Sequence, residues 1–512
     1  QNSYIRPSGE YLNGNFGFDY YFNDKTSAGA SARLNNSWSG RTTDNKAFVQ
    51  NPDGSLIQQV NADNSEDGTN ENYVYSAYLR HQLDSLGQQI TLDVDYVQYR
   101  SQQDQIFLNS IFDPQGALAA EDRVDGDLPS EINIYAAKLD YEKPLKNGMK
   151  FDAGLKSAFT ETDNEAIYTN TVEGVTTPDY NLSNQFLYDE WIHAGYVNLS
   201  KSMNKLDFQA GLRGEITEMD GRQLGNPVQP DSSFTRTFES LFPTVFLAWR
   251  VDSNMVHQFS FSYGRRIDRP QFSDLNPFIS PLDRFTFYAG NPDLLPTFSN
   301  NFSLTHTWKQ MINSTFTYSR TTDGINETLE IQDEIYFSRP GNIADNQTFV
   351  FSLDGYVPVR NWWSINFYGE YGYLTFDSPL YGQTLASRGD YQFLSLTNTF
   401  QLPKGFRLDV SGRYRSDMVY SQLLLKSYSQ VNIGIQKGLF NGKGNLKLAM
   451  DDIFFGSRGD GVINNLAQTD ADWNSVRDTR RFAIAFSYNF GHSMNAKRRY
   501  QNTGSQSEQN RL

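Results

Sequence analysis

The chain has 512 residues, a formal net charge of −15 at neutral pH and no cysteine. The absence of cysteine excludes a disulfide framework and any thiolate metal site. The negative charge argues against nucleic-acid binding, which needs clustered Lys and Arg. No apolar run approaches the roughly 18 residues of a membrane helix, but a barrel strand needs only about 9–11 residues with every second one apolar. A mean hydropathy of −0.59 therefore does not exclude a membrane barrel.

Alternating apolar and polar residues predict about nineteen strands, which are longer than the five or six residues usual in soluble proteins. Short turns such as Asn23-Asp24 and Met203-Asn204 alternate with long polar loops such as 39–70, 102–129, 163–187, 219–237 and 323–341. The predicted strands are 9–22, 25–38, 71–83, 88–101, 130–143, 149–162, 188–202, 205–218, 238–251, 255–266, 299–309, 312–322, 342–358, 362–374, 389–401, 405–417, 426–439, 444–456 and 479–490.

Short connections at one end of the strands and long ones at the other are typical of outer-membrane barrels, which have short periplasmic turns and long extracellular loops. We therefore predict an all-β fold, a large antiparallel transmembrane β-barrel over residues 1–490, in the cell outer membrane. A soluble propeller or repeat sandwich is the alternative, and the strand length fits it poorly.

The free-energy cost of exposing a charged side chain to lipid shows which face of a strand meets the membrane and which faces the lumen. In 405–415, Phe406, Leu408 and Val410 alternate with a charged set. An Arg facing lipid near the midplane costs about 2–4 kcal/mol, so we expect the charged set to line a wet lumen: Arg407, Asp409, Arg413 and Arg415. Aromatic residues near strand ends suit the two interfacial girdles: Trp191, Trp249, Trp308, Trp362 and Trp363.

The last predicted strand carries Phe482, Phe486, Tyr488 and Phe490. It resembles the terminal aromatic strand by which outer-membrane barrels are recognised for insertion, and such a strand ends on the periplasmic side. The first strand then runs in the same direction as the last, whereas bacterial barrels close with an even number. We expect further strands before Gln1, unless the segment 328–338 is itself a membrane strand.

The stretch from Met255 to Trp308 carries a family resemblance. It contains Arg265–Pro270, then Asp274–Phe278, then Gly290–Pro296. This run resembles the "RRI.RP…DLNPF…GNP.L.P" run of the outer-membrane β-barrel family related to TonB-dependent receptors. The end of the sequence, Glu508–Leu512, is also similar to that family.

The resemblance implies a barrel of about 22 strands with a plug in its lumen, of which this sequence would hold the barrel without the plug. It implies active uptake of a scarce nutrient (a siderophore, vitamin, glycan or peptide), driven by the TonB complex if a plug lies upstream. Outer-membrane lipid and lipopolysaccharide are the expected surroundings. The alternative is a non-transporting structural or accessory subunit of an outer-membrane complex, with a surface lipoprotein as its partner.

The 267–298 loop is rich in aromatic and proline residues, and the prolines stiffen it. Packing on its own aromatics or on the barrel rim is the favoured explanation, and a preorganised ligand or partner site is the functional alternative. The basic residues at its root could bind an anionic substrate or lipopolysaccharide, or pair with Asp268 and Asp274. The candidate residues are Arg265, Arg266, Arg269, Phe272, Phe278, Phe285, Phe287 and Tyr288.

Other chemistry is sparse. Five histidines are scattered without metal-ligand spacing, so we predict neither an enzyme nor a metal centre. Acidic clusters at 63–68, 125–127 and 460–461 could bind loop calcium, but none has the full spacing of a calcium loop, and solvated loops are the favoured explanation. Residues 491–512 are polar and lack periodicity, which predicts a disordered periplasmic tail and no further cofactor.

Overall fold

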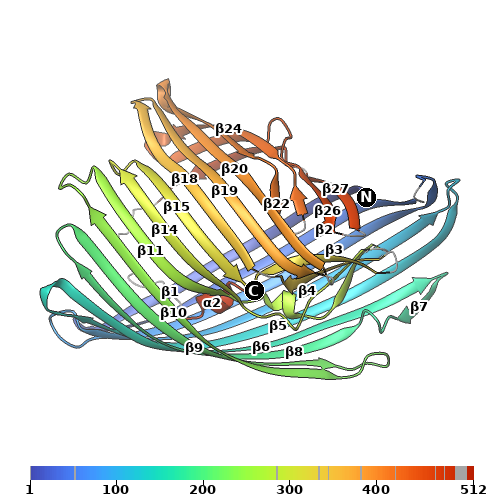
Figure 1. Ribbon diagram of the computed structural model, residues 1–512, viewed down its shortest axis with the longest axis horizontal. Helices are drawn as coiled ribbons and strands as arrows, with labels where there is room; N and C mark the ends of the chain where they lie inside the picture. The colour runs from blue at the N-terminus through green and yellow to red at the C-terminus, as the bar shows by residue number, and fades with distance from the viewer. Residues whose placement is uncertain are drawn as a thin grey trace.

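The computed structural model describes residues 2–50, 53–283, 286–332, 335–343, 345–380, 383–420, 423–466, 469–477, 479–490 and 504–512. Within these residues, nineteen long strands pair in chain order, each antiparallel to the next (Figure 1). They are β1 Asn2–Asn23, β2 Thr26–Gln50, β3 Leu56–Gln82, β4 Gln89–Phe112, β5 Leu118–Pro144, β6 Met149–Val172, β8 Asn184–Ser202, β9 Leu206–Leu224, β10 Ser232–Arg250, β11 His257–Asp268, β14 Thr297–Trp308, β15 Ile312–Thr322, β18 Asp345–Arg360, β19 Trp363–Leu380, β20 Gln383–Leu402, β21 Phe406–Arg415, β24 Tyr428–Leu439, β25 Gly444–Asp451 and β28 Arg481–Tyr488.

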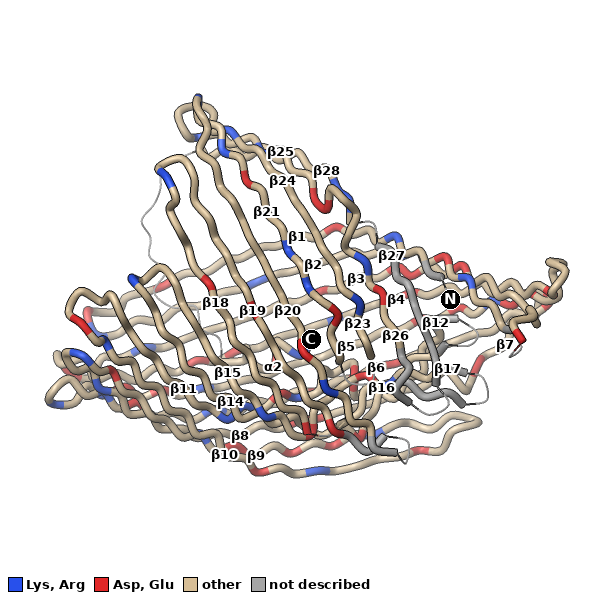
Figure 2. The backbone as a smooth tube through the Cα atoms, turned by 45° about the horizontal axis from the view of Figure 1, so that its top comes forward, with Lys and Arg blue, Asp and Glu red and all other residues tan. Residues whose placement is uncertain are grey.

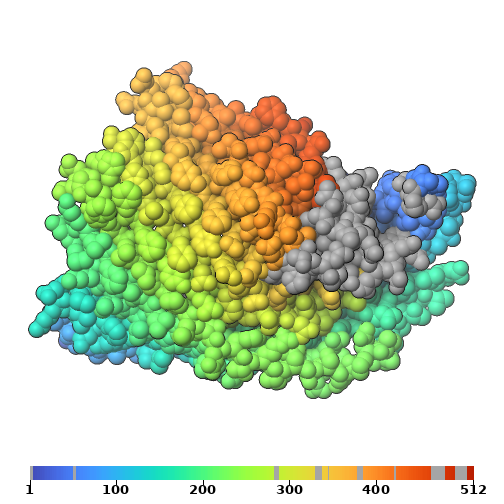
Figure 3. Space-filling model, viewed as in Figure 1, coloured from blue at the N-terminus to red at the C-terminus, as the bar shows by residue number. Residues whose placement is uncertain are grey.

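This arrangement confirms the predicted all-β fold and its strand number. Short elements extend the hairpins: β7 Val175–Pro178, β22 Met418–Tyr420, β23 Leu423–Leu425, β26 Gly459–Leu466 and β27 Thr469–Arg477. In the described part of the chain, no helix has the length and apolar character needed to cross a membrane. The space-filling view shows that the strands coloured green to orange form one continuous wall (Figure 3).

The short turns lie together at one end of the barrel, on the left and upper left of Figure 1. Asx-type hydrogen bonds close them: Asn23 Oδ1 accepts from the backbone N–H groups of Lys25 and Thr26, each at 2.9 Å. Asp84 Oδ1 accepts from Leu86 and Gln88 in the same way. Because Asn and Asp side chains stabilise such turns locally, this end could be located from sequence. Many of the charged residues gather at the hairpin ends (Figure 2).

Four of the predicted long loops are wrong, because the strands continue through most of them. β2 and β3 stay paired as far as Gln50 and Leu56, inside the predicted loop 39–70. The same holds for the predicted loops 102–129, 163–187 and 219–237, which β4, β5, β6, β8, β9 and β10 enter. Beyond the membrane no lipid selects apolar residues, so these polar extensions lack the alternation that marks a strand.

Alternation sets an inner and an outer face on each strand. In β6, Leu155 faces outward with 63 % of its surface exposed, whereas Lys156 faces inward and is 8 % exposed. Aromatic rings form an outward band across five neighbouring strands, with successive centroids 6.1, 5.0, 6.3 and 4.5 Å apart. The band consists of Tyr75, Tyr96, Tyr135, Phe159 and Trp191.

A second aromatic group lies beside the short turns. Trp362, Trp363 and Phe400 stack with centroids 6.0–6.2 Å apart, and Trp249 lies 6.1 Å from Phe259. Aromatic residues at two levels of the outer face are typical of the two interfaces of a membrane barrel.

The described barrel has two free edges. β28 pairs with β25 alone, and β1 pairs with β2 along its length and with β27 only at residues 2–5, in parallel. Nineteen antiparallel strands leave β1 and β28 running in the same direction, so they cannot close the barrel with each other. An odd number of further strands between them would give the even number that such barrels use.

The segment 328–338 does not alter this count. Its described residues lie in a hairpin of β16 Ile325–Gln332 and β17 Ile335–Asn342, so the predicted loop 323–341 is wrong as well. The hairpin joins β12 Ile279–Asp283 and β13 Thr286–Ala289 in a separate four-stranded sheet of order β12-β13-β17-β16. This small sheet shares no strand with the barrel wall.

We expect Leu155→Arg to lower the free energy of unfolding by about 2–4 kcal/mol, because Leu155 faces lipid between the two aromatic levels. Denaturant titration of the protein refolded in lipid vesicles measures this change. Leu86→Arg is the control, since Leu86 is 78 % exposed in the β3–β4 turn. An equal effect of both substitutions would contradict the assignment of the outer face.

Candidate functional site

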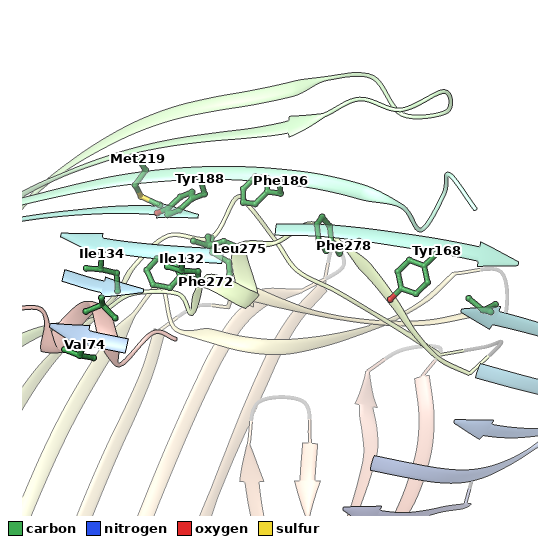
Figure 4. Close-up of a cluster of buried hydrophobic side chains, with 14 of the residues drawn as sticks. Val74, Ile132, Ile134, Tyr168, Phe186, Tyr188, Met219, Phe272, Leu275 and Phe278 are labelled. Carbon is green, nitrogen blue, oxygen red and sulfur yellow. The ribbon is translucent and has the colours of Figure 1, made fainter. Parts of the chain in front are cut away.

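The loop between β11 and β14 folds into the barrel and packs against its inner wall. Its single helical turn, α1 Phe272–Leu275, buries Phe272 and Leu275, which are 2 % and 1 % exposed. Leu294, near the end of the loop, is fully buried. The facing side chains come from the inner faces of β3, β5, β8 and β9 (Figure 4): Val74, Ile132, Ile134, Phe186, Tyr188 and Met219.

An ion pair fixes the root of this loop. The Arg269 guanidinium lies 2.6 Å from Glu215 Oε2 on β9 and donates to Thr217 Oγ1 at 3.1 Å. Both charged side chains are less than a tenth exposed, and Arg213 also pairs with Glu215. A buried charge is tolerated only when it is paired and hydrogen-bonded, so this contact specifies the inward direction of the loop.

The sequence motifs of the loop meet each other in space. The Asn291 N–H donates to the Asp274 carbonyl at 2.6 Å, and the Asn291 side-chain amide donates to the Pro340 carbonyl at 3.1 Å. A Cβ atom at Gly290 would lie 1.9 Å from the Asn276 carbonyl oxygen. Only glycine permits this approach, so the motif residues hold the two halves of the loop together.

The candidate residues of this loop do not form one external surface. Phe272 and Phe278 are buried in the inner cluster and Arg269 pairs with Glu215. Phe287 stacks on Phe337 of the small sheet with centroids 5.6 Å apart. The Tyr288 hydroxyl donates to Asp274 at 3.3 Å, and burial raises the pKa of both groups.

The two remaining arginines lie away from that cluster. Arg265 stacks over the Phe298 ring at 4.8 Å and donates to the Leu241 carbonyl, while Arg266 is exposed. Pairing with Asp268 and Asp274 was one alternative for these arginines, and Arg269 pairs with Glu215 instead. Phe285 lies outside the described residues. Phe272 and Phe278 are packed inside the protein, as the packing explanation of the loop predicts.

The other candidate sets lie on single strands. On β21, Arg407 Nε donates to Asp409 Oδ1 at 3.0 Å, Arg415 stacks over Tyr428 at 5.0 Å and Arg413 is exposed. This charged face is opposite to the one that carries Leu408 and Tyr414, in register with Leu394 and Phe400 of β20.

The candidate aromatic residues of β28, and Phe490 just after it, lie on one face of this edge strand together with Ile484. Their exposed fractions are 64 % for Phe482, 59 % for Phe486, 45 % for Tyr488 and 89 % for Phe490.

The end of the sequence forms part of the inner cluster, which sequence reasoning missed. Residues 504–512 are ordered and contain a helical turn, α2 Gln506–Gln509. Glu508 is 1 % exposed and lies 2.8 Å from Lys156 Nζ on β6, and Arg511 pairs with Glu190 on β8. The prediction of a disordered periplasmic tail is therefore wrong for these nine residues. Paired buried charges, rather than apolar periodicity, hold them in place.

A cavity of about 300 Å³ remains between the loop and the wall. It is lined by polar and aromatic groups, among them Gln103, Gln105, Asn164, Phe278, Tyr288 and Arg511. This volume lies at the lower end of the range for small-molecule sites.

The acidic clusters are not loops that converge on an ion. Residues 63–68 lie within β3, residues 125–127 within β5 and residues 460–461 within β26, so successive side chains point to opposite faces. In the described residues, no group of three or more His, Asp or Glu side chains could hold a metal ion.

The sequence profile of the outer membrane protein beta-barrel family matches residues 81–488. The chain belongs to this family. It is an outer-membrane protein, and the resemblance seen in the 265–296 motifs is confirmed at the level of the family. The sequence matches no curated protein.

Solved structures that share the fold include the following three receptors. The siderophore receptor PiuA from Acinetobacter baumannii is 11 % identical with a TM-score of 0.55, over 94 % of this chain and 80 % of PiuA. The ferric yersiniabactin uptake receptor FyuA from Yersinia pestis is 12 % identical with a TM-score of 0.53, over 95 % and 80 %. The ferric-catecholate import receptor Fiu from E. coli K12 is 9 % identical with a TM-score of 0.55, over 95 % and 81 %.

We expect Gly290→Ala to displace the loop, because the new methyl group would overlap the Asn276 carbonyl, and to cost about 1–3 kcal/mol of stability through overpacking. Limited proteolysis in detergent, followed by mass mapping of cuts in 267–298, measures the displacement. Gly438→Ala is the matched control, since a Cβ atom there would meet nothing within 4 Å. Identical cleavage of both variants would contradict the inward packing of the loop.

Proposed function

We propose that this chain is the barrel of an outer-membrane receptor for the active uptake of a scarce nutrient. The observation that carries the proposal is the shared fold with three proteins named as siderophore or iron-complex receptors. A large barrel of this kind needs a filled or gated lumen to avoid a leak, and the inward 267–298 loop contributes to that filling.

The nutrient class stays broad: a siderophore, vitamin, glycan or peptide. The inner cavity, with its glutamine, asparagine and tyrosine side chains, offers hydrogen bonds to a small polar group. Energy coupling would require the TonB complex and a plug. We propose no catalytic role, and the three similar proteins are named as receptors.

The alternative is a non-transporting accessory barrel with a surface lipoprotein as its partner. Its expected docking surface was the aromatic loop, and the inward burial of Phe272 and Phe278 weakens that version. Outer-membrane lipid and lipopolysaccharide surround the protein under either proposal.

Three measurements on native cells test the proposal. We expect the intact mass and N-terminal sequence of the native polypeptide to extend upstream of Gln1 by enough residues for further strands and a plug. We also expect deletion of the gene to abolish growth on one limiting nutrient, and dissipation of the proton-motive force to abolish uptake of the same compound.

An unchanged nutrient profile, together with stable co-purification of surface lipoproteins, would contradict the transporter and favour the accessory barrel. A mature protein that begins at Gln1 would mean either that closing strands come from another chain or that the strand count is wrong, and it would favour the accessory barrel. Complementation with the intact gene is the control for both phenotypes.

A further inference from the structure

The segment Gly504–Leu512, called the tail here, lies on the inner wall of the barrel rather than at its rim. Figures 1 and 2 both place α2 and the chain end near the middle of the molecule. The Ser505 N–H donates to Asp95 Oδ2 of β4 at 2.9 Å, and Ser505 is fully buried. The tail therefore occupies space enclosed by the wall strands.

Two charged contacts attach the tail to the wall. Lys156 Nζ donates to both carboxylate oxygens of Glu508, at 2.9 and 2.8 Å, and to Ser507 Oγ at 2.7 Å. Arg511 pairs with Glu190, which also accepts from the Tyr188 hydroxyl at 2.9 Å. Each of the four charged side chains is at most 6 % exposed.

The four buried charges restrict which segment can bind here, because buried charges are tolerated only with partners of opposite sign at close range. The wall offers a cation from β6 and an anion from β8. The tail offers an acid and, three residues later, an arginine, which one helical turn places on neighbouring positions. The wall site is thus complementary to this short segment in both charge order and spacing.

The same arginine also contacts the inward loop. Arg511 Nε donates to the Pro270 carbonyl at 2.9 Å, and its guanidinium lies 4.1 Å from the Phe272 ring centroid. The Phe272 N–H donates to the Arg511 carbonyl at 3.3 Å, and Leu512 packs against the inner cluster. The tail therefore bridges the wall and the base of the loop.

We propose that the tail is an intramolecular latch: Lys156 and Glu190 form a binding site for Gly504–Leu512, and the bound tail keeps the 267–298 loop folded into the lumen. Release of the tail would remove the two hydrogen bonds and the cation–π contact that Arg511 provides to Pro270 and Phe272. The loop would then keep the Arg269–Glu215 pair at its root, the Arg236–Asp293 pair near its other end and its apolar packing on the wall.

An engineered disulfide tests whether the tail occupies this site in the membrane. A Cβ atom at Gly504 would lie 3.3 Å from the Lys138 Cβ, close to the spacing of natural disulfides. The protein has no cysteine of its own. We expect Gly504→Cys with Lys138→Cys to form an intramolecular disulfide in intact outer membranes, identified by mass spectrometry of the linked peptides.

The control pair is Gly504→Cys with Leu139→Cys. Leu139 is the next residue on β5 but faces outward and is 43 % exposed, so it cannot reach the tail. Cross-linking of the Lys138 pair no greater than that of the Leu139 pair would overturn the proposal, and would be the result if a plug or another chain held this space instead.

A charge swap tests the latch itself. We expect Glu508→Lys to decrease the cross-linked fraction of the Lys138 pair several-fold and to increase protease cleavage within 267–298, because it places like charges together. Adding Lys156→Glu restores the opposite charges and should restore both readouts. Cleavage that stays at the wild-type level when the tail is displaced would overturn the latch.

The exposed pair Arg222–Asp231 provides the control for charge changes in general, with side chains 57 % and 61 % exposed. We expect Asp231→Lys to leave both readouts unchanged. Migration of folded and heat-denatured protein on gels verifies that each variant inserts and folds, so that a loss of cross-linking reports release of the tail.

Discussion

The constraint on which this structure depends is that backbone polar groups in hydrocarbon must be hydrogen-bonded within the protein. Strict antiparallel pairing in chain order satisfies it from β1 to β28, and the pairing continues beyond the aromatic band into polar extensions. The same constraint makes the outer edges of β1 and β28 costly. It also sets the alternation of Leu155 and Lys156, since one face of every strand meets lipid and the other faces inward.

The inner face of the barrel carries charged side chains in a space that the protein itself partly fills. These charges therefore need partners of opposite sign. Glu190, Glu215 and Lys156 are each less than a tenth exposed. An unpaired charge at such a site costs several kcal/mol. Arg269 from the loop and the two charged residues of the tail supply the opposite charges. The filling of this part of the lumen is therefore electrostatically specified, and the apolar contacts of Phe272 and Leu275 add to it.

The sequence predicts what depends on neighbouring residues and misses what depends on distant ones. Alternation such as Phe406 to Arg415 predicts strands, and Asn23 and Asp84 predict turns, since both signals are local. The density of aromatic residues identifies 267–298 as unusual. Its inward direction depends on Glu215, which lies 54 residues before Arg269. The position of Glu508 depends on Lys156, which is 352 residues away, and no periodicity records such a pairing.

Under the proposed uptake function, a solute that passes through this part of the lumen requires the loop or the tail to move. The Arg269–Glu215 pair lies on the wall and has Arg213 as a second partner for Glu215, which makes the root of the loop the firmer anchor. The tail adds two charged contacts without any strand pairing, so it can leave while every hydrogen bond of the barrel ladder and of the small sheet stays intact.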